Sequence, residues 1–200
     1  MEIVIYILIA GVIILLGWFL ISLFRGKPWT INLFYLRVFM QLLFDNPEFL
    51  TMLGFLDRFG IHGHNAKFAD SSDAHQTKIL ERTKRDLAIL RSYDRRKQTP
   101  VQLISTDILD WFVDDMLKDG EFRYHDYPVN QMFGVQSSVP DLMMNMHPLK
   151  TKTNAKDYIK RLQAIPKKFD QVLEGLKIRE GKGIVPPNFT IKHVINEMED

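Results

Sequence analysis

The sequence predicts a mainly α-helical protein, in which one N-terminal transmembrane helix is followed by a multi-helix soluble region with an irregular segment around residues 121–150. Three observations lead to this class. Residues 3–24 are apolar and uncharged, helix-start signals recur along the rest of the chain, and no stretch alternates apolar and polar residues for long enough to predict a sheet. The predicted domains are a transmembrane anchor, 1–25, and a helical domain, 26–200.

The first segment is long enough to cross a bilayer. Residues 3–24 contain no charged residue and no proline, and they supply the roughly 20 apolar residues that a hydrocarbon core requires. Trp18 and Trp29 lie near one end, where indole rings favour the membrane interface. A cleaved signal peptide is the alternative, but no basic residue precedes the segment and no small-residue cleavage site follows it. We therefore expect an uncleaved single-pass membrane anchor, and Arg25 and Lys27 after it favour a cytoplasmic body.

The first helices of the soluble region are predicted from apolar periodicity and from their start signals. Residues 31–44 are apolar on nearly all sides, which is typical of a helix that is deeply buried or lies against a bilayer. Asn46 and Pro47 predict the start of the next helix, as an N-cap and a first helical residue. Residues 60–72 are polar and rich in turn formers, so we expect a loop there.

More helices are predicted after this loop. Asp73 and Gln76 resemble a capping box for a helix that ends at about Arg96. Later helices are expected at 105–118, at 140–146, from Thr153 or Asn154 to Gly181, and from Thr190 onwards. Pro166 is expected to kink or interrupt the third of these. The last one keeps its apolar stripe without a stop signal, so we expect the natural sequence to continue beyond it.

Composition excludes several classes of function. The chain has 26 basic and 24 acidic residues, a balance too even to drive nucleic-acid binding, so no nucleic-acid partner is expected. It contains no cysteine, which excludes disulfides, thiol nucleophiles and cysteine-based zinc sites. His-Glu-x-x-His, Gly-x-Ser-x-Gly and phosphate-binding glycine patterns do not occur. We therefore predict no catalytic residue and no metal ligand in this chain.

Two residue patterns could suggest a metal site. His62 and His64 form a His-x-His pair, but no third ligand follows at a recognised spacing, so the pair is expected to be incidental. Four acidic residues share one side of the helix predicted at 105–118, where a solvated face is the expected explanation. They are Asp107, Asp110, Asp114 and Asp115.

Two stretches of the chain resemble a known protein family. They are 126–136, followed by His147 and Pro148, and 157–162, followed by Pro166 and 183–187. The family is catalogued as domain of unknown function eight-eight-five, and its members are regarded as zinc metallopeptidases. The resemblance covers roughly residues 36–198. It implies a longer helical enzyme whose zinc motif lies downstream of the region seen here.

The resemblance implies that the chain is the membrane-anchored N-terminal region of a zinc-dependent peptidase-like hydrolase. Zinc is implied for the full-length family, while this chain is expected to carry no cofactor and to be inactive alone. A non-enzymatic, membrane-tethered helical module that binds a partner protein is the alternative. The expected partners are the lipid bilayer, through residues 3–24, and a peptide substrate only together with the missing C-terminal part.

The irregular segment supplies candidates for one wall of a substrate cleft. Tyr127, Asn130, Gln131 and Gln136 carry a phenol and amides, which can hold a peptide backbone by hydrogen bonds. The alternative is that these side chains satisfy buried backbone groups within the irregular segment itself.

Overall fold

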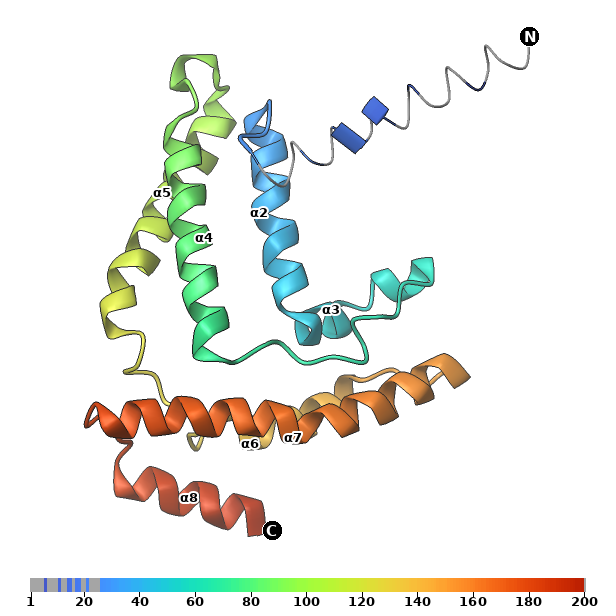
Figure 1. Cartoon of the computed structure of the whole chain (residues 1–200), viewed down its shortest axis with the longest axis vertical. Helices are drawn as coiled ribbons and strands as arrows, with labels where there is room; N and C mark the ends of the chain where they lie inside the picture. Colours follow the sequence, from blue (N-terminus) through green and yellow to red (C-terminus); the bar gives the residue numbers. More distant parts are fainter. Residues whose placement is uncertain are drawn as a thin grey trace. The chain divides into compact units, whose positions relative to one another are not determined.

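The computed structural model describes residues 26–199 together with Tyr6, Gly11, Ile14, Leu15, Gly17, Trp18 and Ile21. Within this part the chain is helical and has no strand, which confirms the mainly helical class there (Figure 1). The predicted anchor, 3–24, falls mostly outside the described residues. Among the residues that are described, no helix is both long enough and apolar enough to span a membrane.

The chain divides into two compact units, one of residues 1–42 and 83–115 and the other of residues 43–82 and 116–200. Among its described residues, parts of three helices build the first unit: α2 (Ile31–Asp45), α4 (Asp73–Arg91) and α5 (Pro100–Asp119). The helices that lie wholly in the second are α3 (Pro47–Leu53), α6 (Val135–Asp141), α7 (Lys152–Gly181) and α8 (Asn188–Glu199). Shorter helical turns are η1 (Leu56–Phe59), η2 (Arg95–Lys97), η3 (Gly120–Phe122) and η4 (Leu142–Met146).

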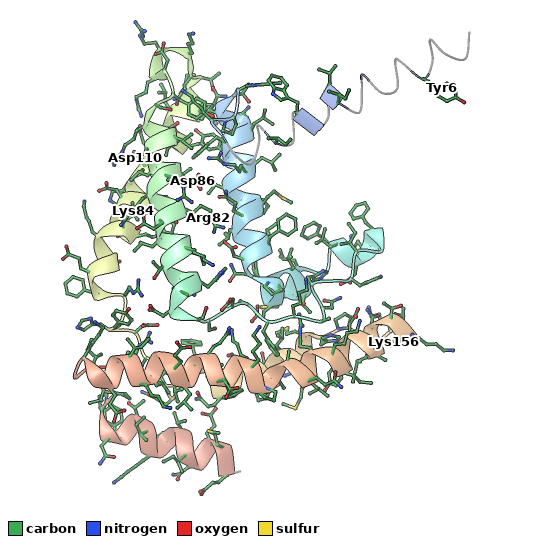
Figure 2. The ribbon with its side chains drawn as sticks, viewed as in Figure 1. Tyr6, Arg82, Lys84, Asp86, Asp110 and Lys156 are labelled. Atoms are coloured by element: carbon green, nitrogen blue, oxygen red, sulfur yellow. The ribbon has the colours of Figure 1, made fainter. Side chains whose placement is uncertain are left out.

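Polar contacts join the helices of the first unit. Arg37 on α2 is 2% exposed and donates to the Asp86 carboxylate on α4 at 2.7 Å and to the Gly26 carbonyl. Figure 2 labels Asp86 on the ribbon of α4. The Tyr35 hydroxyl and Thr106 Oγ1 lie 2.8 Å apart and join α2 to α5. Arg37 is buried and Tyr35 is partly buried, and both have partners on neighbouring helices, so α2 tolerates these polar side chains although it was predicted to be apolar on nearly all sides.

The start of α4 differs from the prediction by one residue. The hydroxyl of Ser72, rather than the carboxylate of Asp73, accepts a hydrogen bond from the His75 amide, at 3.3 Å. The Asp73 carboxylate is instead used by Arg123 and by the Tyr124 hydroxyl, which donates to it at 2.9 Å. The capping-box prediction for Asp73 was therefore wrong, because that carboxylate forms tertiary contacts.

The helix predicted at 105–118 begins five residues earlier, at Pro100. The Gln102 amide donates to Thr99 Oγ1 at 3.3 Å, and the Thr99 amide donates to Gln102 Oε1 at 2.9 Å. Pro100 occupies the first helical position, where the missing N–H costs nothing. Helix α4 ends at Arg91 rather than Arg96, and Asp94 caps the separate turn η2.

Helix α7 is longer and more regular than predicted. Thr151 is its N-cap, in a capping box with Asn154, so the cap lies before the predicted Thr153 or Asn154. The helix continues unbroken through Pro166, and the predicted interruption does not occur. Pro166 and Leu162 are both exposed, so water can satisfy the Leu162 carbonyl that the proline leaves without a helix partner.

The irregular segment ends earlier than predicted. Helix α6 begins at Val135 and contains Pro140, and the π-helical turn η4 follows it. Helix α8 begins at Asn188, directly after Pro187, rather than at Thr190. Helix α6 starts before the predicted residue because the chain enters it at Gly134, which provides no side-chain cap that the sequence could reveal.

Candidate substrate cleft

The second unit contains a cleft with a volume of about 710 Å³. Its lining comes from five places: α3 with the residue before it, the loop at 68–71, the first turn of α4, the stretch from Asp126 through η4, and the C-terminal half of α7. The volume falls in the range of about 300–1,000 Å³ that is usual for ligand pockets. The cleft is therefore large enough to hold several side chains of a peptide.

The floor of the cleft is apolar. Val135, Val139 and Val172 form a buried hydrophobic cluster in this unit, Phe68 packs against them, and all four residues line the cleft. Leu142, which is 5% exposed, extends this floor. The lining also includes four apolar side chains that are open to solvent, Phe49 (40% exposed), Met52 (55%), Phe133 (83%) and Met146 (41%).

At one edge of the cleft, an ion pair forms hydrogen bonds to the backbone of the 68–71 loop. Both carboxylate oxygens of Glu48 on α3 accept from the Ala69 amide at 2.9 Å. Lys168 on α7 donates to the Ala69 carbonyl at 3.1 Å and lies 3.5 Å from the Glu48 carboxylate. Both polar groups of the Ala69 backbone are therefore bonded to side chains of helices, which fixes the loop between α3 and α7.

Further along the same edge, Gln171 on α7 holds the start of α4. Its side-chain amide donates to the Asp70 carboxylate at 2.8 Å, and its carbonyl accepts from the Ser71 amide at 3.1 Å. Hydrogen bonds from the Ser72 side chain and amide lower the pKa of Asp70, so this carboxylate stays ionised. Like Glu48, Asp70 is used within the fold.

The opposite edge is held by an arginine. Arg179 on α7 donates to the backbone carbonyl of Asp126 at 3.1 Å and also bonds its carboxylate. It donates in addition to the Gly175 carbonyl one turn earlier. The charged side chains of both edges thus have partners, and the surface that the cleft offers to a ligand is mainly apolar.

A buried arginine anchors the loop behind the cleft. Arg161 on α7 is 0% exposed, and it donates to Thr51 Oγ1 and the His64 carbonyl at 2.8 Å and to the Lys67 carbonyl at 3.0 Å. Burial lowers the pKa of Arg161 to about 10, because desolvation disfavours the charged form. The guanidinium supplies donors to carbonyls of the loop that no secondary structure would satisfy.

Asn65 completes this network. It is 0% exposed, donates to the Asp57 carboxylate at 2.7 Å, and lies 2.9 Å from the Thr51 hydroxyl. Its backbone carbonyl lies 3.1 Å from a ring nitrogen of His147. Every part of the Asn65 side chain is therefore used, and the loop predicted at 60–72 is an ordered part of the second unit.

The two histidines of the His-x-His pair meet at one carboxylate. His62 Nδ1 lies 2.7 Å from Asp57 Oδ1, and His64 Nε2 lies 3.9 Å from Asp57 Oδ2. The first distance is that of a hydrogen bond, and Asn65 shares the same oxygen, which leaves no room for a zinc ion at about 2 Å from each ligand. Throughout the described part of the chain, no group of three or more metal-binding side chains is arranged to hold a metal. These residues do not fit a zinc ion.

Comparison with known proteins places the chain in a family. The sequence profile described as "Bacterial protein of unknown function (DUF885)" matches residues 47–200. The chain belongs to this family. No curated protein and no solved structure matched it. The matched range begins at the first residue of α3 and includes every residue of the cleft lining except Asn46.

The four residues predicted for the cleft of this DUF885 protein lie beside it, and none is in its lining. Asn130 accepts from the amides of Met132 and Phe133 at 2.9 and 2.8 Å and donates to the Tyr127 carbonyl at 2.8 Å. Gln136 is 8% exposed and donates to the Asn130 carbonyl at 2.7 Å. The side chains of Asn130 and Gln136 therefore stabilise the turn through hydrogen bonds to its backbone. Contact of the four residues with a peptide stays a prediction.

The same turn explains one glycine of the family signature. A Cβ at Gly134 would lie 2.0 Å from Gln136 Oε1 and 2.6 Å from the Asn130 carbonyl oxygen. Only glycine therefore fits where this turn closes over Gln136. The stretch 126–136, which carried the resemblance, is a tightly packed turn that leads into α6.

Sequence inspection missed the polar side of α7. The helix residues Asn154, Asp157, Arg161, Lys168 and Val172 share one face, at spacings of three, four or seven. All of them except Lys168 are less than 9% exposed. The sequence did contain a signal for these buried contacts. On this face of the helix, polar and charged residues occupy positions where apolar residues are expected, and charged residues are rarely buried without partners.

Proposed function

We propose that this chain is the membrane-anchored region of a zinc-dependent peptidase-like hydrolase, in which the second unit supplies one wall of the substrate cleft. The cleft in that unit carries the proposal. Its volume of about 710 Å³ suits a short stretch of peptide. Its floor of Val135, Val139, Val172 and Phe68 suits an apolar side chain. Membership of the DUF885 family supports the assignment, because the family match includes this cleft.

In this proposal the chain binds and orients the substrate. An apolar side chain enters between α3 and α6, where contact with the floor removes its surface from water. The edges held by Glu48 with Lys168 and by Asp126 with Arg179 keep the walls in place. Preformed walls reduce the entropy that a peptide loses when it binds.

The zinc ion and the acid that activates water belong, in this proposal, to residues other than those described. The histidines and acids of the described part do not form a metal site. Zinc polarises the scissile carbonyl in enzymes of this kind. No step of that chemistry is assigned to His62 or His64.

A pair of neighbouring side chains tests the cleft. Phe133 lines it and is 83% exposed, whereas Met132 is 69% exposed and is not part of the lining. We expect the full chain in detergent to bind a fluorescent peptide with a central phenylalanine more tightly than the same peptide with a central aspartate. Phe133→Asp should weaken that binding about tenfold, because a bound peptide would no longer cover the apolar surface of the Phe133 ring. Met132→Asp should leave it unchanged.

Fluorescence anisotropy titrations of both variants give the answer, and circular dichroism checks that both are folded. Equal affinity for the two peptides, or equal losses in the two variants, would contradict a substrate cleft at this place.

A second candidate function rests on the first unit. Helix α5 exposes Val101 (72%), Ile104 (61%), Ile108 (62%) and Trp111 (66%), which recur at helical spacing on one side. An exposed apolar stripe of this kind suits the groove of a partner protein. We propose a membrane-tethered interaction module as the alternative. Loss of a co-purifying partner in Ile104→Glu, with no effect of Phe133→Asp, would favour it.

A further inference from the structure

The fold brings together two groups of basic residues that are far apart in sequence. Lys27 follows the predicted anchor, and its ammonium donates to the Ser92 carbonyl at 2.9 Å, across 65 residues of sequence. The same ammonium lies 4.4 Å from the centre of the Tyr93 ring. The Tyr93 hydroxyl in turn donates to the Pro28 carbonyl. The loop after α4 is therefore packed onto the residues that follow the anchor.

We define the basic tip as residues 26–30 and 92–99. It contains four cations, Lys27, Arg95, Arg96 and Lys97, and one acid, Asp94. The side chains of Arg95 and Arg96 are 53% and 90% exposed. A tip with this composition presents a net positive charge to the solvent.

Nearby acids reduce this charge without cancelling it. Asp94 pairs with Arg96 at 3.1 Å, and Asp107 on α5 pairs with Arg95 at 2.7 Å. Both are exposed ion pairs, which are weak and exchange readily with other partners. Asp110 and Asp114 pair with Arg91, a cation that lies just outside the tip and offsets part of their charge.

Aromatic side chains accompany the cations. Trp29 in the tip is 58% exposed, and its ring centre lies 5.1 Å from that of Trp18. Tryptophan favours the headgroup region of a bilayer, where its ring is apolar and its N–H stays hydrated. In sequence, Arg25 adds one more cation directly before the tip.

We propose that the basic tip binds the anionic headgroups of the membrane leaflet from which the anchor emerges. The proposal rests on the proposed membrane anchoring by residues 3–24. Lysine and arginine within a screening length of an anionic leaflet are attracted to it, and each strengthens binding about fivefold. The tip thus fixes how the first unit meets the membrane.

Because the chain contains no cysteine, a single introduced cysteine can be labelled specifically. Val101, 72% exposed in the first turn of α5, is replaced by cysteine in the full chain and spin-labelled. The protein is reconstituted into phosphatidylcholine vesicles with or without phosphatidylserine. Flotation reports anchoring, and accessibility of the label to a water-soluble nickel chelate reports contact of the tip with the membrane.

We expect flotation with both kinds of vesicle and a protected label only where phosphatidylserine is present. Neutralising the turn with Arg95→Gln, Arg96→Gln and Lys97→Gln should lower the equilibrium constant for binding of the tip to the membrane about a hundredfold, because three factors of about fivefold multiply. The matched control removes the same charge from α7, with Lys152→Gln, Lys156→Gln and Lys160→Gln. All three lysines are exposed in the second unit, and Figure 2 labels Lys156. This control should keep the protection.

The outcomes separate the tip from the anchor. Flotation with both vesicles but equal label accessibility would overturn the basic tip and leave the anchor standing. Flotation only with phosphatidylserine, lost on neutralising η2, would support the tip and refute the anchor. Loss of protection in the control as well as in the η2 variant would show general charge attraction and overturn the proposal.

Discussion

Arg91 in the first unit and Arg161 in the second each donate three hydrogen bonds, one from Nε and two from one terminal nitrogen. They differ in their exposure to solvent and in the charge of their partners. Arg91 is half exposed and donates to the carboxylates of Asp110 and Asp114. Arg161 is fully buried and donates to two carbonyls and one hydroxyl. Burial lowers the pKa of Arg161, whereas the carboxylates raise the pKa of Arg91. Because its partners are charged, Arg91 would rank as the more important residue, but the difference in exposure reverses that order.

Replacing Arg161 is expected to have the largest effect. Arg161→Met should lower the free energy of unfolding by about 3–5 kcal/mol, because Thr51 and the carbonyls of His64 and Lys67 lose their donor in a place that water does not reach. Urea unfolding followed by circular dichroism measures the change. If the free energy of unfolding fell by less than about 1 kcal/mol, water would be replacing the hydrogen bonds of the guanidinium, and the network would be accessible to solvent.

A pH titration probes the same network at His64. Burial lowers the pKa of His64 below its usual value of 6.5, with Arg161 and His62 acting in the same direction and the Asp57 carboxylate opposing them. The unfolded chain therefore takes up a proton at a higher pH than the folded chain. The stability conferred by neutral His64 is present above pH 6.5 and is lost as the pH falls towards the folded pKa.

We expect urea midpoints to fall as the pH is lowered below 6.5, and the fall to be smaller in His64→Gln. His193→Gln, at an exposed position on α8, is the matched control and should keep the wild-type pH profile. An unchanged profile in His64→Gln would assign the pH dependence to other groups.

The smallest effect is expected at Arg91. Arg91→Met removes all three of its hydrogen bonds, but water replaces them at the surface, so the urea midpoint should stay close to that of the wild type. The measurement is best made at low and at high salt. A large loss that persists at high salt would show that the ion pairs with Asp110 and Asp114 hold α4 against α5, and the contrast with Arg161 would then fail.

The fold was largely predictable from the sequence because helix signals are local. The helix predicted at 31–44 and the loop predicted at 60–72 are both present, and α7 ends at Gly181 as predicted. Several helix starts were misplaced, as at Asp73 and Ser105. A capping side chain can be used elsewhere in the fold, and a proline can start a helix as well as end one.

The cleft could not be predicted in the same way, because its residues come together only in the folded chain. Glu48, Ala69 and Lys168 are separated by 21 and 99 residues, and nothing in their local sequence links them. The predicted residues Asn130 and Gln136 were chosen because amides can bind a peptide backbone. The backbone that they bind in this structure is that of their own turn.

Side chains of other elements hydrogen-bond to the backbone of the 60–72 loop, and this limits which substitutions alter the loop. The groups held there are the carbonyls of His64 and Lys67 and both polar backbone groups of Ala69, which every residue except proline supplies in full. Substitutions at Lys67 or Ala69 would therefore leave these bonds in place, whereas a change of Arg161 or Lys168 on α7 removes them. The conformation of this loop is therefore set by side chains of α7, almost a hundred residues away in the sequence. The amino acids of the loop itself can change while its backbone conformation is kept.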